Sequence, residues 1–361
     1  MRLIRLTENY IREIVDGRIG TRRPQIESCS LALGSFDGLH RGHQELIREV
    51  KASRERLGLA SGALFTFMQH PRQLLDSGAE PFLLTTWRAK LAMLQGLDVP
   101  VIVAADFCPA LADLGYEEFV EKFLADYLGM KHLVAGYDTH LGADRQGTAD
   151  SLKKLGQRLG YTVDVVPPVK AGDHIISSSA IRKALIEGDM DLAATMLGRP
   201  YAIWGEVTPG DRRGREIGYP TANIQPLDPM KLMPAEGVYA VRVQVPGDVV
   251  PPDVTGVLAR VTEALPEVDL QGDILSAAPS DWAVFGGMLN YGNVPTFHGD
   301  GLPEPRAEAN IFGFEGDLRG RNVKVEWISR LRTEKKFAGT AQLVDQLERD
   351  AQQAREVLGL A

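Results

Sequence analysis

Cysteines and long apolar runs are scarce in this chain of 361 residues. Its two cysteines, Cys29 and Cys108, lie in no metal-ligand spacing, so the sequence predicts neither a disulfide framework nor a zinc site, and a reducing compartment fits. No stretch approaches the roughly 18 apolar residues of a membrane span. The amino-terminal segment alternates charged with apolar residues and lacks the apolar core of a signal peptide. We therefore expect a cytoplasmic protein without a membrane partner.

Basic residues are fewer than acidic residues. The chain has 40 Lys and Arg against 48 Asp and Glu, a formal net charge of −8. A general nucleic-acid binder needs a basic surface that releases counterions, so we expect no nucleic-acid partner. A nucleotide substrate needs only one local electropositive pocket and is not excluded. The length suits about two to three domains of a globular protein.

The first half of the chain alternates short apolar runs with segments of helical periodicity. Five runs have the length and residue types of buried strands: 30–34, 62–67, 101–105, 131–136 and 161–166. Helical periodicity appears between them, for example in residues 43–57 and 117–128. This alternation predicts an α/β domain with a doubly wound parallel sheet, which we assign to residues 1–197.

The second half has apolar runs without helices between them. These runs, separated by Gly and Pro turns, are 201–207, 237–245, 282–290, 307–314 and 322–328. The pattern predicts an antiparallel β-barrel or sandwich, closed by one amphipathic helix from about residue 341 to 358. We assign residues 198–361 to this domain and interpret the Pro- and Asp-rich segment 246–280 as an insertion.

The stretch GSFDGLHRGHQ, residues 34–44, follows a predicted strand and opens a predicted helix. At this edge of an α/β sheet, backbone N–H groups and the helix dipole bind phosphates, and glycines allow close approach. His40 and His43 are three residues apart, so one side of the first helical turn carries both, where they can donate hydrogen bonds to a leaving pyrophosphate. The alternatives are a glycine-rich turn with solvated histidines, or a metal site that lacks a convincing third ligand.

This stretch resembles the HxGH signature of adenylyl- and cytidylyltransferases, and in its longer form the N-terminal module of the bacterial bifunctional riboflavin kinase/FMN adenylyltransferase family. TFMQHP (66–71) resembles that family's TFxPHP segment, and ISSSAIR (176–182) resembles its ISSTxIR motif. GYDTHLGADRQG (136–147) lies where the family has VGxDFxFGxxRxG, but it lacks both phenylalanines of DFxFG. The serines at 177–179 can cap a helix, and the planar guanidinium group of Arg182 can donate two hydrogen bonds to a phosphate.

The stretch GDRRGREIGYPTANI, residues 210–224, is the strongest signal of the second half. Thr221 and Asn223 are two residues apart, so an extended chain projects both oxygens to one side, where they suit Mg²⁺ that bridges ATP phosphates. Glycines with arginines between them suggest a mobile basic flap. The alternative is a glycine-rich hairpin followed by an asparagine near a strand end. The stretch resembles the GxPTAN signature of riboflavin kinases, and residues 289–297 and 314–337 resemble two further segments of that family.

Glu308 in RAEANIFGF matches the catalytic glutamate of the riboflavin kinases, the base that takes the proton from the ribityl 5′-hydroxyl. Strand alternation places it on one face with Phe312 and Phe314, whose apolar side chains would raise its pKa toward useful basicity. A solvated glutamate on an edge strand is the alternative interpretation.

The resemblance implies a bifunctional enzyme that uses ATP and Mg²⁺. The barrel domain would convert riboflavin and ATP to FMN and ADP, and the N-terminal domain would convert FMN and a second ATP to FAD and pyrophosphate. The alternative is a riboflavin kinase only, with a degenerate or re-specialised adenylyltransferase domain, for which the unusual DTHLG loop is the support. We expect a monomer or a weak homo-oligomer.

The resemblance also implies a set of site residues. Catalysis would depend on Glu308, His40 and His43, and the metal would lie on Thr221 and Asn223. The flavin would contact His70, Pro71, Asp138 and Asn290. The residues implied for nucleotide and phosphate binding are Gly34, Phe36, Asp37, Gly38, Gly42, Ser177, Ser178, Ser179, Arg182, Gly210, Arg212, Arg215 and Gly218.

Overall fold

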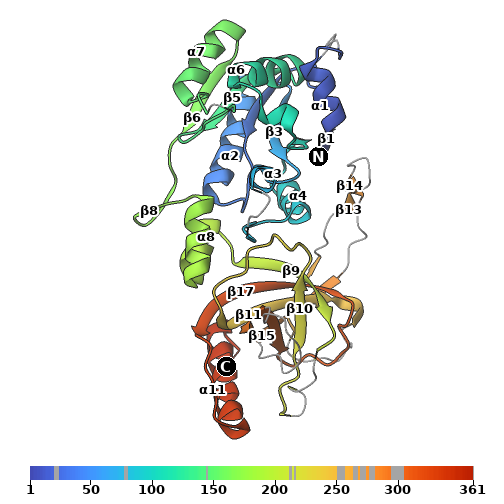
Figure 1. The fold of residues 1–361 in the computed structure, drawn as a ribbon, viewed down its shortest axis with the longest axis vertical. Coiled ribbons are helices and arrows are strands. Elements are labelled where there is room, and N and C mark those ends of the chain that lie inside the picture. Colours follow the sequence, from blue (N-terminus) through green and yellow to red (C-terminus); the bar gives the residue numbers. More distant parts are fainter. Residues whose placement is uncertain are drawn as a thin grey trace. The chain divides into compact units, whose positions relative to one another are not determined.

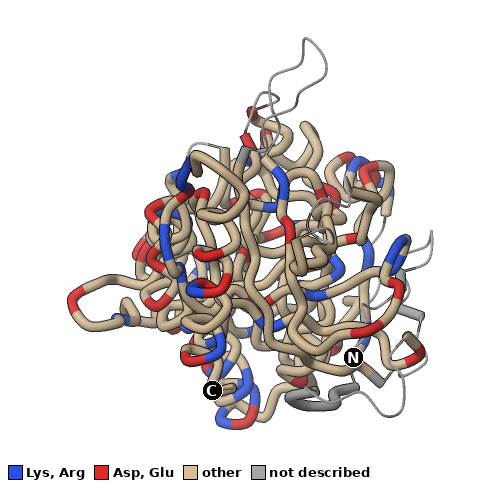
Figure 2. The backbone as a smooth tube through the Cα atoms, turned by 90° about the horizontal axis from the view of Figure 1, so that it is seen from below, with Lys and Arg blue, Asp and Glu red and all other residues tan. Residues whose placement is uncertain are grey.

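The computed structural model describes most of the chain. The described residues are 1–19, 24–76, 80–143, 145–210, 214, 217–249, 257–262, 267–268, 274–275, 281–293 and 305–360. No helix among them is long and apolar enough to cross a membrane. Acidic and basic residues are interspersed along this part of the chain (Figure 2).

The chain divides into two compact units. They comprise Met1–Ser178 with Leu265–Ala277, and Ser179–Ala264 with Ala278–Ala361. Helix α9 (Met190–Leu197) contacts barrel strands β9 and β17, so it and the preceding helix α8 (Ser178–Glu187) fall almost entirely in the second unit. The domain boundary predicted at residues 197 and 198 stays a prediction, drawn from the change in sequence pattern.

Six parallel strands form the sheet of the first unit, in the order β1-β4-β3-β2-β5-β6 (Figure 1). They are β1 (Arg2–Leu6), β2 (Cys29–Leu33), β3 (Ser61–Phe67), β4 (Val101–Ala105), β5 (Met130–Gly136) and β6 (Thr162–Val166). The five predicted strands are confirmed to within one residue at each end. Strand β1 was not predicted because two of its five residues are arginines, so this edge strand has no continuous apolar run.

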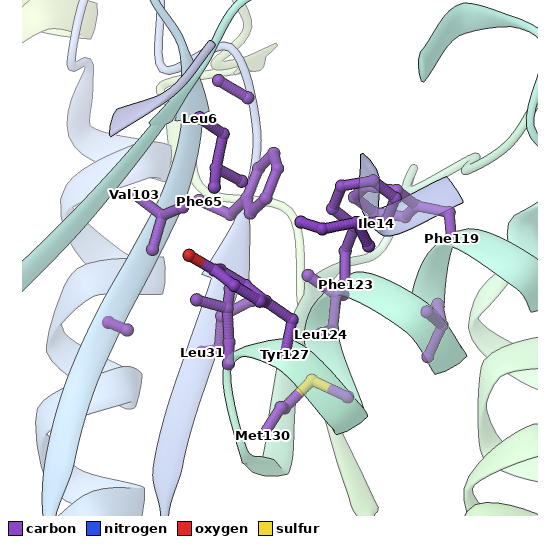
Figure 3. Close-up of a cluster of buried hydrophobic side chains, with 14 of the residues drawn as sticks. Leu6, Ile14, Leu31, Phe65, Val103, Phe119, Phe123, Leu124, Tyr127 and Met130 are labelled. Atoms are coloured by element: carbon purple, nitrogen blue, oxygen red, sulfur yellow. The ribbon is translucent and has the colours of Figure 1, made fainter. Parts of the chain in front are cut away.

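Helices cover both faces of this sheet. Adjacent residues of one strand point to opposite faces, and both faces are buried: Leu31, Phe65 and Val103 contribute to one apolar cluster (Figure 3), and their neighbours Ala32, Leu64 and Ile102 contribute to the other. The helices of this unit are α1 (Glu8–Val15), α2 (Arg41–Arg56), α3 (Pro71–Leu75), α4 (Trp87–Gly96), α5 (Pro109–Ala112), α6 (Tyr116–Phe119), η1 (Val120–Tyr127) and α7 (Ala149–Leu159). The predicted doubly wound α/β fold is confirmed.

The helix predicted over residues 117–128 changes type along its length. It begins as α6 and continues as the π-helix η1. Val120, Phe123, Leu124 and Tyr127 are buried in the core of the first unit. A spacing of three to four residues buries one side of either helix type, so the pattern predicted a helix without its hydrogen-bonding class.

Strands β2 and β5 are neighbours at the centre of the sheet, and the chain continues from them in opposite directions. Strand β2 leads to β3 on one side, whereas β5 leads to β6 on the other. In an open α/β sheet the loops after two such strands diverge and leave a crevice for a ligand. The GSFDGLHRGHQ stretch follows β2 and therefore lies at this crevice.

Antiparallel strands of the second unit close into a barrel. The order β11-β17-β9-β10-β16-β15 becomes a ring because β11 also pairs with β15, and β12 extends the sheet from β15. The strands are β9 (Tyr201–Thr208), β10 (Ala222–Pro226), β11 (Gly237–Pro246), β12 (Val257–Thr262), β15 (Asp281–Asn293), β16 (Pro305–Ile311) and β17 (Asn322–Arg332). The predicted antiparallel barrel is confirmed. The strand predicted over 307–314 ends at Ile311, shortly before Gly313, whose φ of 67° leaves the β region.

Helix α11 (Thr340–Leu358) packs on the barrel, where the sequence predicts a closing helix. Its Ala351, Ala354 and Leu358 join Ala240, Met288 and Phe312 in one apolar cluster. Of the predicted insertion at 246–280, the structure describes its first residues, β12 and the short hairpin of β13 (Glu267–Val268) and β14 (Ile274–Leu275). The remainder lies outside the described residues.

Candidate active sites

The segment between β2 and α2 has a strained backbone. Phe36 and Leu39 adopt positive φ angles of 49° and 40°, and Gly38 between them has a φ of 89°. Glycine tolerates such a conformation, but each non-glycine residue in it costs roughly 1–3 kcal/mol. The surrounding structure must therefore hold this segment, residues 34–40, which we call the histidine loop.

Asp37 ties the histidine loop to a segment that lies more than 40 residues further along the chain. Its Oδ1 accepts a hydrogen bond from the Thr85 N–H at 2.9 Å, and its Oδ2 accepts one from the Leu84 N–H at 3.1 Å. The Gly38 N–H donates to Thr85 Oγ1 at 2.9 Å, and Ser178 Oγ donates to the Asp37 carbonyl at 2.9 Å. The buried Asp37 carboxylate thus binds backbone donors, and its predicted phosphate contact stays a prediction.

The two histidines lie against each other at the start of α2. His40 is the N-cap residue, and its Nδ1 accepts a hydrogen bond from the His43 N–H at 3.3 Å. The two rings stack with their centroids 3.6 Å apart, and Phe36 meets His43 edge-on at 5.2 Å. A Cβ at Gly42 would lie 3.2 Å from the His40 ring, so a larger residue at this position would crowd the ring.

Phe36 contributes packing to this loop. Its side chain has no exposed surface and belongs to the apolar cluster of the first unit that contains Ile47 and Leu91. A Cβ at Gly34 would lie 3.6 Å from the Phe36 ring. Any nucleotide contact of Phe36 is therefore left to its backbone, and the predicted role stays a prediction.

The other predicted residues of the first unit lie at the carboxyl ends of the strands that flank β2. After β3, His70 caps α3, its Nδ1 accepts from the Arg72 N–H at 3.2 Å, and Pro71 is the first residue of that helix. After β5, the exposed Asp138 offers its carbonyl to His140 Nδ1 at 2.8 Å. Parallel strands bring these loops to the same edge as the histidine loop.

The unusual DTHLG loop after β5 is anchored by packing. Leu141 packs against the core that contains Phe119 and Phe123. A Cβ at Gly142 would lie 2.4 Å from the Tyr116 backbone nitrogen, and Gly142 has a φ of 83°, so this turn requires glycine.

The ISSSAIR segment opens helix α8. Ser178 is its first residue, and Arg182 lies one turn further along the helix, half-buried. Ser177 is half-buried and Ser179 is exposed. Their predicted phosphate contacts stay predictions.

Three predicted residues of the barrel form a row across three neighbouring strands. Asn223 on β10 is the direct partner of Glu308 on β16, and Glu308 is the direct partner of Asn290 on β15. Directly opposed residues of an antiparallel pair carry their side chains on the same face, with Cβ atoms about 4.5–5.5 Å apart. The predicted metal ligand, base and flavin contact are therefore adjacent.

The donor set around Asn223 fits a hard cation. The buried Asn223 Oδ1 has no hydrogen-bond partner within the described part of the chain. Buried polar atoms are normally satisfied, so an oxygen ligand without a partner fits Mg²⁺. Thr221 lies two residues earlier and is exposed. No group of three His, Cys, Asp or Glu side chains that could hold a metal occurs among the described residues.

Glycines let the predicted flap approach these ligands. A Cβ at Gly210 would lie 1.7 Å from Asn223 Nδ2, and a Cβ at Gly214 would lie 2.2 Å from the Tyr219 carbonyl. Gly218 has a φ of 84° in a turn. Arg212 and Arg215, the predicted phosphate contacts of the flap, lie outside the described residues.

The sequence predicts that Phe312 and Phe314 share a strand face with Glu308. Phe312 lies in the cluster beneath α11, on the face that strand alternation gives Glu308. Phe314 follows the turn at Gly313 and packs edge-on against Phe285 at 5.4 Å, on the opposite face of β15 from Asn290. The shared face predicted for both rings is therefore right for Phe312 and wrong for Phe314.

Sequence reasoning missed several residues beside the sites. Asn310 Nδ2 donates to the Pro220 carbonyl at 2.8 Å and so ties β16 to the segment of Thr221. Glu334 accepts from Asn290 Nδ2 at 3.4 Å. Lys90 lies beneath the histidine loop. The sequence offered one signal for it: a lysine on a helix face that otherwise carries the apolar residues Trp87, Leu91 and Leu94.

Comparisons with known proteins identify the relatives of this chain. A FAD synthetase family model matches residues 22–180, and a riboflavin kinase family model matches residues 197–358. The chain is 35% identical over 326 residues to the bifunctional riboflavin kinase/FMN adenylyltransferase of Bacillus subtilis (strain 168), covering 90% of each chain. It is 32% identical over 333 residues to the protein of that name from Pseudomonas fluorescens, covering 92% of this chain and 94% of the relative.

A solved structure shares the fold over its whole length. It is described as a macrolide-efflux protein from Streptococcus pneumoniae, with a TM-score of 0.74, 31% sequence identity, and coverage of 98% of this chain and 99% of that chain. Together with the two family models, the identity to curated relatives along nine-tenths of the sequence confirms the resemblance drawn from the motifs. The chain belongs to the bifunctional riboflavin kinase/FMN adenylyltransferase family.

Proposed function

We propose that the two sites divide the two activities of this bifunctional enzyme, which produces FMN and FAD. The barrel forms FMN from riboflavin and ATP, and the first unit forms FAD from FMN and ATP. The row of Asn223, Glu308 and Asn290 carries the first assignment. The stacked pair of His40 and His43 at the start of α2 supports the second.

In the kinase site, Glu308 accepts the proton of the ribityl 5′-hydroxyl. The hydroxyl oxygen bonds to the γ-phosphorus of ATP while the bond from that phosphorus to the bridging oxygen breaks and ADP leaves. Thr221 and Asn223 would hold Mg²⁺, which neutralises charge on the phosphates when bound. Asn290, opposite Glu308 on the other neighbouring strand, binds the flavin. Gly210 and Gly218 with Arg212 and Arg215 complete the contacts to phosphate.

In the adenylyl-transfer site, no side chain of the protein attacks the nucleotide. An oxygen of the FMN phosphate bonds to the α-phosphorus of ATP, and the bond from that phosphorus to the pyrophosphate oxygen breaks. His40 and His43 stabilise the charge on pyrophosphate, helped by the positive end of α2. Gly34, Gly38 and Gly42 allow the backbone to approach the phosphates.

Further residues are assigned to substrate binding in this proposal. Arg182 and the serines at 177–179 bind phosphates. His70, Pro71 and Asp138 bind the flavin from the loops after β3 and β5, which flank β2 in the sheet. Asp37 acts through the histidine loop, because its carboxylate is occupied by the Leu84 and Thr85 N–H groups.

Product analysis tests both assignments. The purified chain is incubated with riboflavin, ATP and Mg²⁺, and separately with FMN, ATP and Mg²⁺, and flavins are separated by chromatography. We expect FAD in both reactions. FMN from the first reaction with no FAD from either would refute the adenylyl-transfer assignment and favour a kinase whose DTHLG loop no longer supports the second step.

A further inference from the structure

A buried lysine lies directly behind the histidine loop. Lys90 on α4 is only 6% exposed, and its Nζ donates to the Ser35 carbonyl at 2.7 Å and to the Phe67 carbonyl at 3.3 Å. It also lies 3.5 Å from Thr66 Oγ1 and 5.5 Å from the centre of the Trp87 ring. The ammonium group is thus surrounded by oxygens and an aromatic face inside the first unit.

Burial of this ammonium group is costly. An ion removed from water loses several kcal/mol of solvation unless a partner compensates it. The buried carboxylate of Asp37 supplies the opposite charge that favours the ammonium form. Burial nevertheless lowers the pKa of Lys90 to about 8, against an ordinary value of 10.5. An apolar residue would fill the same space without this penalty, so the charge has a use that packing does not explain.

The two carbonyls that Lys90 binds begin two different loops. Ser35 lies in the histidine loop, just before the strained residues Phe36 to Leu39. Phe67 is the last residue of β3, and the segment after it, residues 68–71, contains His70 and Pro71. One ammonium group therefore joins the carboxyl ends of β2 and β3, where the proposed nucleotide and flavin contacts begin.

We propose that Lys90 is a positioning residue for adenylyl transfer, whose ammonium group holds the histidine loop and residues 68–71 in the relative placement that the reaction requires. The inference rests on the proposed function of the first unit. Lys90 touches neither substrate in this view. Its loss leaves the Ser35 and Phe67 carbonyls without their donor and releases both loops at once.

Two variants of the full chain test this role. Lys90→Met keeps about the volume of the side chain but offers no donor, whereas Lys90→Gln keeps neutral N–H donors on a side chain that is one bond shorter. Arg88→Met is the matched control, because Arg88 is an exposed residue of the same helix. FAD formation is measured with ATP and FMN varied in turn, and riboflavin phosphorylation is measured in the same preparations.

We expect Lys90→Met to lower kcat/KM for FAD formation on the order of 10²-fold, the scale of a misplaced reacting group. KM should rise for both ATP and FMN, since both loops are released. Lys90→Gln should lie between Lys90→Met and the unchanged chain. Riboflavin phosphorylation, and FAD formation by Arg88→Met, should stay within about twofold of the unchanged chain, because neither depends on these two carbonyls.

Other outcomes would overturn the inference. If Lys90→Met and Lys90→Gln both retain the kinetic constants of the unchanged chain, Lys90 is a passive core residue. If only one of the two KM values rises, or if Arg88→Met loses as much activity, Lys90 does not join the two loops. If Lys90→Met fails to fold, Lys90→Gln decides, with a rise in both KM values required. No FAD from the unchanged chain would instead refute the proposed function of the first unit.

Discussion

The two sites of this protein rest on opposite kinds of backbone. In the barrel, regular strand pairing aligns Asn223, Glu308 and Asn290, and no special conformation is needed. In the first unit, the histidine loop has positive φ angles at Phe36 and Leu39 and depends on groups behind it. The comparison teaches that strand register can position one site, whereas the other depends on tertiary contacts that offset local strain.

The kind of contact that holds each site makes the difference concrete. Asp37 binds the Thr85 N–H 48 residues away, and its carbonyl accepts from Ser178 Oγ 141 residues away. The row in the barrel depends on ladder pairing between strands that are adjacent in the sheet. Substitutions of the residues that hold the histidine loop should therefore lower FAD formation without touching the reacting groups. Riboflavin phosphorylation should respond chiefly to substitutions of Asn223, Glu308 and Asn290 themselves.

The largest expected effect separates the two sites completely. His43→Ala removes one ring of the stacked pair and should abolish conversion of FMN to FAD, because the charge on pyrophosphate loses a donor. Riboflavin phosphorylation should remain largely intact. Chromatography of both reactions measures this, and loss of both activities would mean that the two sites are not independent.

Glu308→Gln should have the next largest effect. A glutamine cannot take the proton of the ribityl hydroxyl, so phosphorylation should slow by about 10²-fold or more, the usual scale for loss of a general base. Conversion of FMN to FAD should continue. A near-normal rate of riboflavin phosphorylation by this variant would remove Glu308 from the mechanism.

Asp37→Ala tests the dependence of the histidine loop on its anchors. Loss of the carboxylate leaves the buried Leu84 and Thr85 N–H groups without their acceptor, so the first unit should lose about 3 kcal/mol of stability. Denaturant unfolding followed together with FAD formation measures this. Asp37→Asn, which keeps one acceptor oxygen, is the control and should lose less. A change below about 0.5 kcal/mol in Asp37→Ala would contradict the anchoring role.

Gly210→Ala tests the approach of the proposed flap to Asn223, the proposed metal ligand in the barrel. The added Cβ would lie 1.7 Å from Asn223 Nδ2, so one of the two must move. We expect the KM for ATP in riboflavin phosphorylation to rise by about tenfold, on the order of 1.4 kcal/mol. Gly339→Ala is the control, since a Cβ there meets no atom within 4 Å. An unchanged KM in Gly210→Ala would place the flap away from the nucleotide.

The smallest expected effect is a pH dependence confined to the first unit. Burial lowers the pKa of Lys90 to about 8 from an ordinary 10.5, with Asp37 as the opposing charge. Between these two pH values the unfolded chain binds more protons, so the stability of the first unit should rise with pH. FAD formation should fall several-fold over the same range as the ammonium charge is lost. Lys90→Gln should lack both trends, and their persistence in that variant would assign them to another group.

Much of the fold could be predicted before the structure, and the candidate site residues stay predictions. Five strands of the first sheet follow from short apolar runs, and the barrel follows from runs without helices between them. The placement of Phe314 and strand β1 were missed for local reasons, since Gly313 turns the chain after β16 and two of the five residues of the edge strand β1 are arginines. The contacts of Lys90, Asn310 and Glu334 could not be predicted, because each joins segments that only folding brings together.

The sequence by itself determined which chemical groups are present and their local order: GSFDGLHRGHQ between a strand and a helix, and Thr221 and Asn223 two residues apart. Local order follows from periodicity and turn residues, which act over a few positions. The tertiary structure alone decided that Asn223 faces Glu308 and that Lys90 lies beneath Ser35 and Phe67. Register and burial depend on the packing of distant segments, so the alignment of one site and the support of the other arise only in the folded chain.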